Sequence, residues 1–341
     1  MIKKNILYIF FFSFLLSAFL CGCTGMAASA EEYYSIGMAY FELGKFEEAE
    51  RWLNRARTAD RTMTASQYNL GRLAFERQRY TEAADLFEDI LKRDPDNVLA
   101  LRAAAYTRIK TGDLGIADKH YKKLLELVPE SIDSGYNHAL VLYAMERYGE
   151  AEQVLIKFPA ALEEKDSLLL YSRSQKAQNK VESIDNYAKW LSVNSDPIVQ
   201  YEYAKLLEQY ELYARALEEY RKCLSQTVSP DTEPKRSDLR FSIARLLLIA
   251  DYESIEGITE MEIAVNEGFN DIEALEELLG SGKVSHDNMD SLRLIIYNIQ
   301  RAQDNAETEQ YQTGENEQNR NALSGSSISS ETGTEGNTGA P

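Results

Sequence analysis

Apolar and polar residues divide the chain into three parts. Residues 6–20 are nearly all apolar. From residue 30 to about residue 300, apolar residues recur three or four positions apart and are interrupted by short polar turns, which indicates amphipathic helices. Residues 301–341 are poor in apolar residues and rich in Gly, Ser, Thr, Asn and Glu, so we expect a disordered tail, because such a segment buries too little surface to offset its ordering entropy.

The helical pattern carries an internal repeat. Four alanines fall 34 residues apart, and other apolar and small positions keep the same step; the alanines are Ala49, Ala83, Ala117 and Ala151. Pro95 and Pro129 are also one period apart, where a second helix would end, because proline cannot continue the helical hydrogen-bond ladder. Small residues at fixed positions allow two helices of a hairpin to approach closely. The pattern therefore predicts an all-α body of stacked helical hairpins.

The period and its residues resemble the tetratricopeptide repeat family. The resemblance implies a right-handed superhelical solenoid of about seven hairpins. Residues 30–163 match four regular units, and residues 164–300 read as divergent units and capping helices.

In this family the first helix of each hairpin lines a concave face that binds protein segments. The positions that match here form an aromatic and slightly basic strip, which we call the groove strip: Tyr34, Met38, Phe41, Tyr68, Arg72, Phe75, Arg102, Tyr106, Tyr136 and Tyr143. Tyr and Arg carry much of the binding energy at protein interfaces, so an amphipathic helix or an extended segment is the expected partner. The alternative is that some of these side chains pack on the next hairpin.

The N-terminus reads as an export signal. Two lysines precede the apolar run, which is short for a membrane-spanning helix, and the run LCGC at residues 20–23 resembles a bacterial lipobox. The resemblance implies a signal peptide over 1–22, a lipid anchor (diacylglyceryl and palmitate chains) on Cys23, and a tether over 23–29. Thr24 stands where Asp would favour inner-membrane retention, so we expect a cell-envelope protein on the outer membrane, facing the periplasm. An uncleaved N-terminal anchor helix remains the alternative.

Charge and candidate chemistry narrow the function. The formal net charge of −18 argues against nucleic acid as a partner, because phosphate binding needs a basic stripe. No Cys or His spacing suits a metal, and no cofactor motif is complete: GSGK at residues 280–283 lacks the first glycine and the hydroxyl residue of a phosphate loop. His138 replaces Ile, Leu or Ala of the other repeats and is expected to be a hydrogen-bonded core residue.

These observations favour a non-enzymatic scaffold or adaptor that holds other envelope proteins in its groove. A second hypothesis is a lipoprotein that assists a periplasmic solute transporter by binding a small ligand between hairpins. An enzyme with an unrecognised site in the less regular C-terminal third is the weakest of the three.

Overall fold

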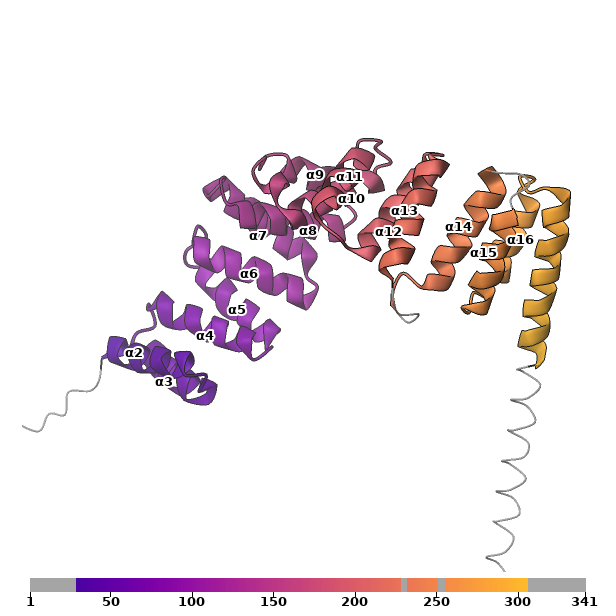
Figure 1. Ribbon diagram of the computed structural model, residues 1–341. Helices are drawn as coiled ribbons and strands as arrows, with labels where there is room; N and C mark the ends of the chain where they lie inside the picture. The colour runs from indigo at the N-terminus through magenta and orange to yellow at the C-terminus, as the bar shows by residue number, and fades with distance from the viewer. Residues whose placement is uncertain (1–28, 228–231, 251–254, 306–341) are drawn as a thin grey trace, which may run out of the picture. The chain divides into compact units, whose positions relative to one another are not determined.

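The protein is all-helical where its structure is described. The computed structural model describes residues 29–227, 232–250 and 255–305, and every regular element in these ranges is a helix (Figure 1). The predicted all-α class is therefore confirmed. The chain divides into two compact units between Gln178 and Asn179. Within the described ranges, no helix is both long and apolar enough to cross a bilayer.

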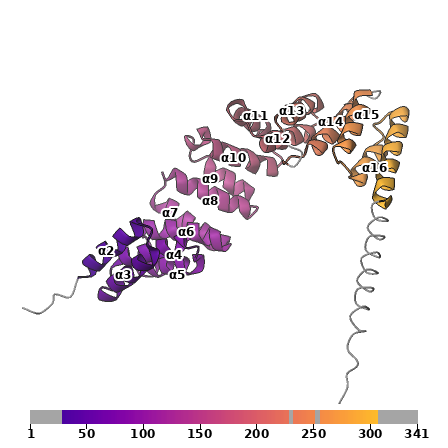
Figure 2. The same ribbon diagram turned by 60° about the horizontal axis from the view of Figure 1, so that its bottom comes forward.

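The first unit is a series of helical hairpins, visible as successive pairs in Figures 1 and 2. Its elements are α2 (Ala30–Glu42), α3 (Phe46–Ala59), α4 (Thr64–Glu76), α5 (Tyr80–Leu91), α6 (Val98–Thr111), α7 (Leu114–Leu127), α8 (Ile132–Ala144), α9 (Tyr148–Leu155), the 3₁₀ turn η1 (Ala161–Glu163) and α10 (Lys165–Ala177). The helices from α2 to α9 pair as the 34-residue period predicts.

The repeated small residues sit where two helices touch. The four periodic alanines all lie on the second helix of their hairpins and are completely buried. A Cβ atom added to Gly71 would lie 2.6 Å from Cε1 of Phe87, and one added to Gly37 would lie 2.9 Å from Cγ of Leu53. These glycines are therefore required by the close approach of the two helices of each hairpin.

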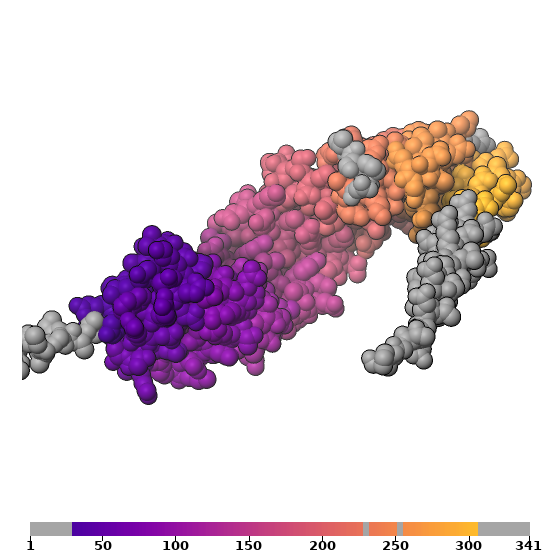
Figure 3. Space-filling model, turned by 90° about the horizontal axis from the view of Figure 1, so that it is seen from below, coloured from indigo at the N-terminus to yellow at the C-terminus, as the bar shows by residue number. Residues whose placement is uncertain are grey.

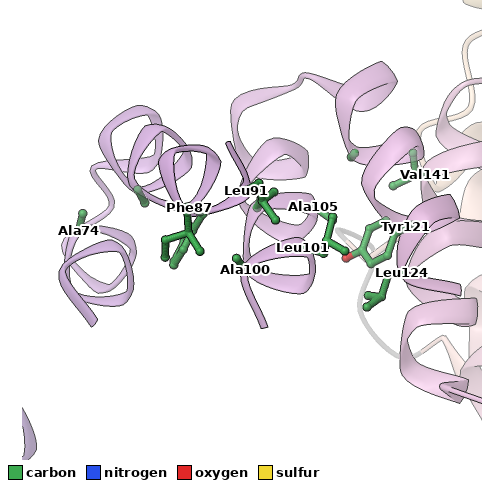
Figure 4. Close-up of a cluster of buried hydrophobic side chains, with 13 residues drawn as sticks. Ala74, Phe87, Leu91, Ala100, Leu101, Ala105, Tyr121, Leu124 and Val141 are labelled. Atoms are coloured by element: carbon green, nitrogen blue, oxygen red, sulfur yellow. The ribbon is translucent and has the colours of Figure 1, made fainter. Parts of the chain in front are cut away.

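Large apolar side chains fill the space between the hairpins. Figure 4 shows the central cluster, in which Phe87 from α5, Leu101 from α6, and Tyr121 and Leu124 from α7 are almost completely buried. Each hairpin thus buries its apolar face against its neighbours, which is how stacked repeats build a continuous core.

The two helices of each hairpin are joined by the same turn. One residue per repeat has a left-handed conformation, with φ of 69° at Gly44, 59° at Gln78, 81° at Gly112 and 59° at Glu146. The next N–H donates to a carbonyl five residues back, as from Lys45 to Tyr40 at 2.9 Å. This is a Schellman helix end, which satisfies carbonyls that the helix leaves without partners.

The regular spacing ends after α9. That helix is short, and the chain continues through Phe158, which is buried, into η1 and α10. α10 packs on α8 and α9 and belongs to the first compact unit, which ends at Gln178.

The second unit contains α11 (Ser183–Val193), α12 (Pro197–Gln209), α13 (Tyr213–Gln226), α14 (Arg236–Ala250), α15 (Ile255–Asn266), α16 (Ile272–Gly280) and a last helix described over residues 286–305. Buried apolar residues from α14 to the last helix form one cluster, in which the rings of Phe241 and Phe269 stack 4.2 Å apart. The glycines of the GSGK stretch end α16 and form a turn, with φ of 68° at Gly282.

Several expectations from the sequence concern residues outside the described ranges. The signal peptide, Cys23 and most of the tether lie outside the described residues, as does the tail from residue 306 onward. The described helix continues through residue 305, so the first five residues of the segment expected to be disordered are helical.

Candidate functional site

The groove strip occupies equivalent positions on the first helix of each regular hairpin. Residues one period apart in stacked equivalent helices face the same side, so the strip forms three parallel rows across α2, α4, α6 and α8. The rows begin at Tyr34, Met38 and Phe41 and continue in steps of 34 residues. Most members are half-buried, whereas Arg72, Arg102 and Tyr106 are exposed.

Polar contacts join the first two hairpins within the strip. The amide Nδ2 of Asn69 on α4 donates to the Tyr34 hydroxyl on α2 at 3.0 Å and to the Ala65 carbonyl at 2.9 Å. Its Oδ1 accepts from Nη1 of Arg72 at 2.9 Å. The Arg72 guanidinium in turn lies 5.0 Å from the centre of the Phe41 ring.

These residues surround a cavity on the strip. It has a volume of about 400 Å³ and is lined by Tyr34, Met38, Tyr68, Asn69, Arg72 and Leu99, among others. The structure thus brings four groove-strip residues together around one opening. The polar groups are held in place by Asn69, so the cavity is pre-formed and does not need a ligand to order it.

Aromatic contacts continue the strip towards α6. The rings of Phe75 and Tyr106 lie 5.6 Å apart, and Nζ of Lys110 lies 5.5 Å from the centre of the Tyr106 ring. Tyr106 nevertheless keeps 42% of its surface exposed. A rigid aromatic side chain that is supported on one side and open on the other is typical of an interface anchor.

The fourth hairpin contributes two tyrosines that are half-buried. Burial, followed by the charge of Asp166, raises the pKa of Tyr136, while Arg173 opposes the shift. The Tyr143 ring packs against the Tyr148 ring at 5.1 Å, edge to face. Part of each ring packs against the core of the fourth hairpin. Tyr136 and Tyr143 therefore contribute to packing as well as to the surface of the strip.

Sequence reasoning did not assign a role to Asn69. It lies 35 residues after Tyr34, one position off the repeat, so a search for residues at the 34-residue step does not pair them. The sequence signal that could have indicated this role is a polar residue on the core side of a strip helix, one turn before an arginine. In the structure Asn69 is buried and both ends of its amide are hydrogen-bonded.

A second cavity lies between the third and fourth hairpins. Its volume is about 440 Å³, and it is lined by Asp118, Leu125, His138, Leu142, Arg147 and Phe158, among others. The carboxylate of Asp118 accepts from Nε2 of His138 at 2.7 Å and from Nη1 of Arg147 at 2.6 Å. The Asp118, His138 and Arg147 group and further charged side chains therefore line this cavity together with the apolar Leu125, Leu142 and Phe158.

His138 is the hydrogen-bonded core residue that the sequence suggested. It is 6% exposed, and burial lowers its pKa, although Asp118 partly opposes the shift. Because the Asp118 carboxylate only accepts, the proton of the neutral ring is on Nε2. Burial alone would raise the pKa of Asp118, but the hydrogen bonds from His138 and Arg147 outweigh it and the pKa is lowered. Nδ1 of His138 has no hydrogen-bond partner among the described residues.

Other candidate chemistry is sparse. No group of three or more His, Cys, Asp or Glu side chains within the described residues is arranged to hold a metal ion. Cys223 is buried and donates to the Pro197 carbonyl at 3.1 Å, and burial raises the pKa of its thiol to about 11. That thiol is therefore a packing residue, since the thiolate is the reactive form.

Comparisons with known proteins agree with this geometry. Stacked helical hairpins with small residues at a 34-residue step define a helical repeat protein. The family model described as tetratricopeptide repeat matches residues 34–98 and 68–132, so this part of the chain carries tetratricopeptide repeats.

Individual relatives are distant. A protein of Treponema pallidum (strain Nichols), named as an uncharacterized lipoprotein, is 25% identical over 180 residues, which span 52% of this chain and 91% of that protein. The human protein O-mannosyl-transferase TMTC3 is 25% identical over 130 residues, or 38% of this chain, but only 14% of that protein is covered. A tetratricopeptide repeat protein of Parabacteroides merdae is similar in structure, with a TM-score of 0.49 and 23% identity over 74% of this chain and 97% of that one.

Proposed function

We propose that this protein is a non-enzymatic adaptor whose groove strip holds a segment of another cell-envelope protein. The observation that carries the proposal is the cavity of about 400 Å³ framed by Tyr34, Met38, Tyr68 and Arg72. Its walls are pre-ordered by Asn69, and exposed Tyr and Arg side chains continue beside it. Interfaces concentrate their binding energy in such residues.

The charge of the strip indicates the chemistry of the partner. Arg72 and Arg102 lie on it and Lys110 lies beside its Tyr106, although the chain as a whole is strongly acidic. A segment that combines acidic side chains with aromatic or aliphatic ones would complement both the cations and the rings. We propose an extended or helical segment of this kind, supplied by a neighbouring protein.

Affinity purification from membranes tests the adaptor role. We expect a defined protein partner that is recovered with the unaltered chain and lost with the double variant Arg102→Glu, Tyr106→Ala. Both side chains are exposed, so the fold is retained. The matched control is Tyr297→Ala, which removes an exposed tyrosine from the last helix. Equal recovery with all three forms would contradict the proposal.

We further propose that Cys23 carries the lipid anchor and that the protein faces the periplasm on the outer membrane. The lipobox-like run and the relative named as a lipoprotein support this. Cys23→Ala should leave the precursor unprocessed in size and abolish acyl labelling. Normal processing of this variant would exclude the lipid attachment.

The second cavity supports the alternative function. A cavity of about 440 Å³ lined by both apolar and charged side chains is large enough for a small ligand, as expected of a transporter-assisting lipoprotein. In that case native protein purified from its host should release a small molecule on denaturation, detectable by mass spectrometry. Leu125→Trp, which fills the cavity, should abolish retention, whereas Ile116→Trp on the same helix should not.

A further inference from the structure

The outer face of the first hairpin is apolar and exposed. Ile36 on α2 and Leu43, the C-cap residue of that helix, keep 37% and 70% of their surface exposed. Tyr33 of α2 packs against Trp52 of α3 with ring centres 5.8 Å apart, and the Arg55 guanidinium lies 4.5 Å from the centre of the indole. We call these five side chains the outer face. In Figure 3 this hairpin, in indigo, forms an end of the first unit.

Two of these positions, those of Ile36 and Tyr33, are buried in the later hairpins of the repeat. One period after Ile36 stands Leu70, then Ala104 and His138, and all three are buried. One period after Tyr33 stands Gln67, then Leu101, also buried. These positions pack on the preceding hairpin. The described helices that pack on α2 are chiefly α3 and, to a lesser extent, α4. The outer face is therefore a packing surface that no described hairpin occupies.

Exposure of such a surface needs an explanation. A terminal repeat in a water-soluble solenoid normally presents a polar outer face, because an apolar one is costly in water. Here the first described hairpin presents Ile36 and Leu43, with Tyr33 and Trp52 partly exposed beside them, and the acidic Glu32 at its N-terminal edge. We therefore expect another protein or a lipid surface to cover the outer face.

The composition of the outer face fits a membrane interface. Trp and Tyr concentrate at the level of the lipid headgroups, where an apolar ring and a polar edge are both satisfied. Arg55 presents several N–H donors beside the indole and suits lipid phosphates. A second copy of the chain is a weaker occupant, because a stable interface usually needs about 800 Å² and some 20 residues per partner.

The position of the outer face along the chain also supports a location at the membrane. Five residues, Thr24 to Ala28, separate Cys23 from Ser29, the N-cap of α2. Such a tether spans at most about 20 Å even when fully extended. With acyl chains on Cys23, the first hairpin cannot move far from the headgroups.

We propose that the outer face of the first hairpin lies in the interfacial region of a lipid bilayer. This inference rests on the proposed lipid attachment at Cys23. The acyl chains supply the anchoring, and the outer face fixes the orientation of the first unit relative to the membrane. The groove strip is then presented at a defined angle and distance from the lipid surface.

The two tryptophans allow a direct test. Mature acylated protein is incorporated into phosphatidylcholine vesicles whose acyl chains carry bromine, which quenches nearby indoles. Trp52 is partly exposed, whereas Trp190 in the second unit is fully buried and serves as the unquenched reference. We expect marked quenching in the unaltered protein and its loss in Trp52→Phe.

A charged variant then separates the outer face from the anchor. Ile36→Glu with Leu43→Glu should reduce the quenching by more than about twofold, because carboxylates oppose entry into the interface. Flotation with the vesicles should be unchanged, since the acyl chains remain. The control Val193→Glu alters an exposed apolar residue in the second unit and should change neither.

Three results would overturn the inference. Vesicle-bound protein without Trp52 quenching shows that the outer face does not touch lipid. Trp52 emission that shifts with protein concentration but not with lipid shows that a second copy covers it. Failure of the mature protein to float shows instead that Cys23 carries no anchor, and the inference falls with that proposal.

Discussion

The side-chain amide of Asn69 donates a hydrogen bond of 3.0 Å to the hydroxyl of Tyr34 and so connects the first helices of two successive hairpins. The same amide holds Arg72 through its oxygen. One buried asparagine thus fixes the spacing of two aromatic and basic rows of the groove strip. The relative positions of Tyr34 and Arg72 therefore depend on a polar contact and not only on apolar packing.

Replacement of Asn69 should therefore cost both stability and partner binding. Asn69→Ala removes the bonds to Tyr34, Ala65 and Arg72 and should lower the free energy of unfolding by about 1–3 kcal/mol. Tyr34→Phe, which removes only the shared hydroxyl, should cost no more than about 1 kcal/mol. Urea denaturation followed by circular dichroism measures both. Equal effects of the two variants would show that the network is not organised around Asn69.

The turn glycines give a second prediction. Gly112 has φ of 81°, so Gly112→Ala forces a Cβ into the left-handed region and should destabilise the protein by about 1 kcal/mol. Gly115, three residues later in α7, has open space around its Cα, and Gly115→Ala should leave stability equal or higher. Comparison of the thermal unfolding of the two variants distinguishes the effect of the left-handed backbone from the general effect of replacing glycine by alanine. A Gly112→Ala protein as stable as the Gly115→Ala protein would contradict the turn assignment.

The buried histidine predicts a dependence on pH. The pKa of His138 is lower in the folded protein than in the unfolded chain, so the unfolded chain binds more protons as the pH falls below about 6.5. The stability contributed by neutral His138 is complete above that pH and is lost as the pH falls through the lowered value. His138→Gln keeps a donor for Asp118 but cannot titrate. Between pH 7 and pH 5 the unaltered protein should lose more stability than this variant, and parallel curves would exclude the assigned shift.

Thiol counting gives a fourth prediction. The precursor has three cysteines, at positions 21, 23 and 223. If processing removes Cys21 and acylates Cys23, only Cys223 keeps a free thiol, and its burial raises the pKa to about 11. Mature native protein should then react negligibly with a maleimide at neutral pH, and one thiol should appear on denaturation. Three reactive thiols after denaturation would show that neither step occurs.

The repeat could be predicted from the sequence because its signals are local and periodic. The alanines at the 34-residue step and the glycines opposite Phe87 and Leu53 are readable from spacing alone, and the structure buries them as expected. Of the four left-handed turns, only those at Gly44 and Gly112 carry a glycine that marks the turn in the sequence. Gln78 and Glu146 occupy the same conformation without the glycine that would mark it.

The contacts that shape the candidate sites were less accessible. The Asn69–Tyr34 bond and the pairing of Asp118 with His138 and Arg147 join residues 20 to 35 positions apart. None of these pairs matches the repeat step, so they depend on how adjacent hairpins rotate against each other. Which residues of the strip stay exposed depends on the same packing, as Tyr106 and Tyr136 illustrate.

Site-specific photo-crosslinking in living cells tests the central claim most directly. A benzophenone amino acid is placed at Tyr106 in the groove strip, with matched placements at Ile116 on the second helix of the same hairpin and at Tyr297 on the last helix, all three exposed. We predict a discrete protein adduct from position 106 that Arg102→Glu abolishes, and no comparable adduct from the other two positions. No adduct at position 106, or the same adducts at all three, would contradict a partner-binding groove.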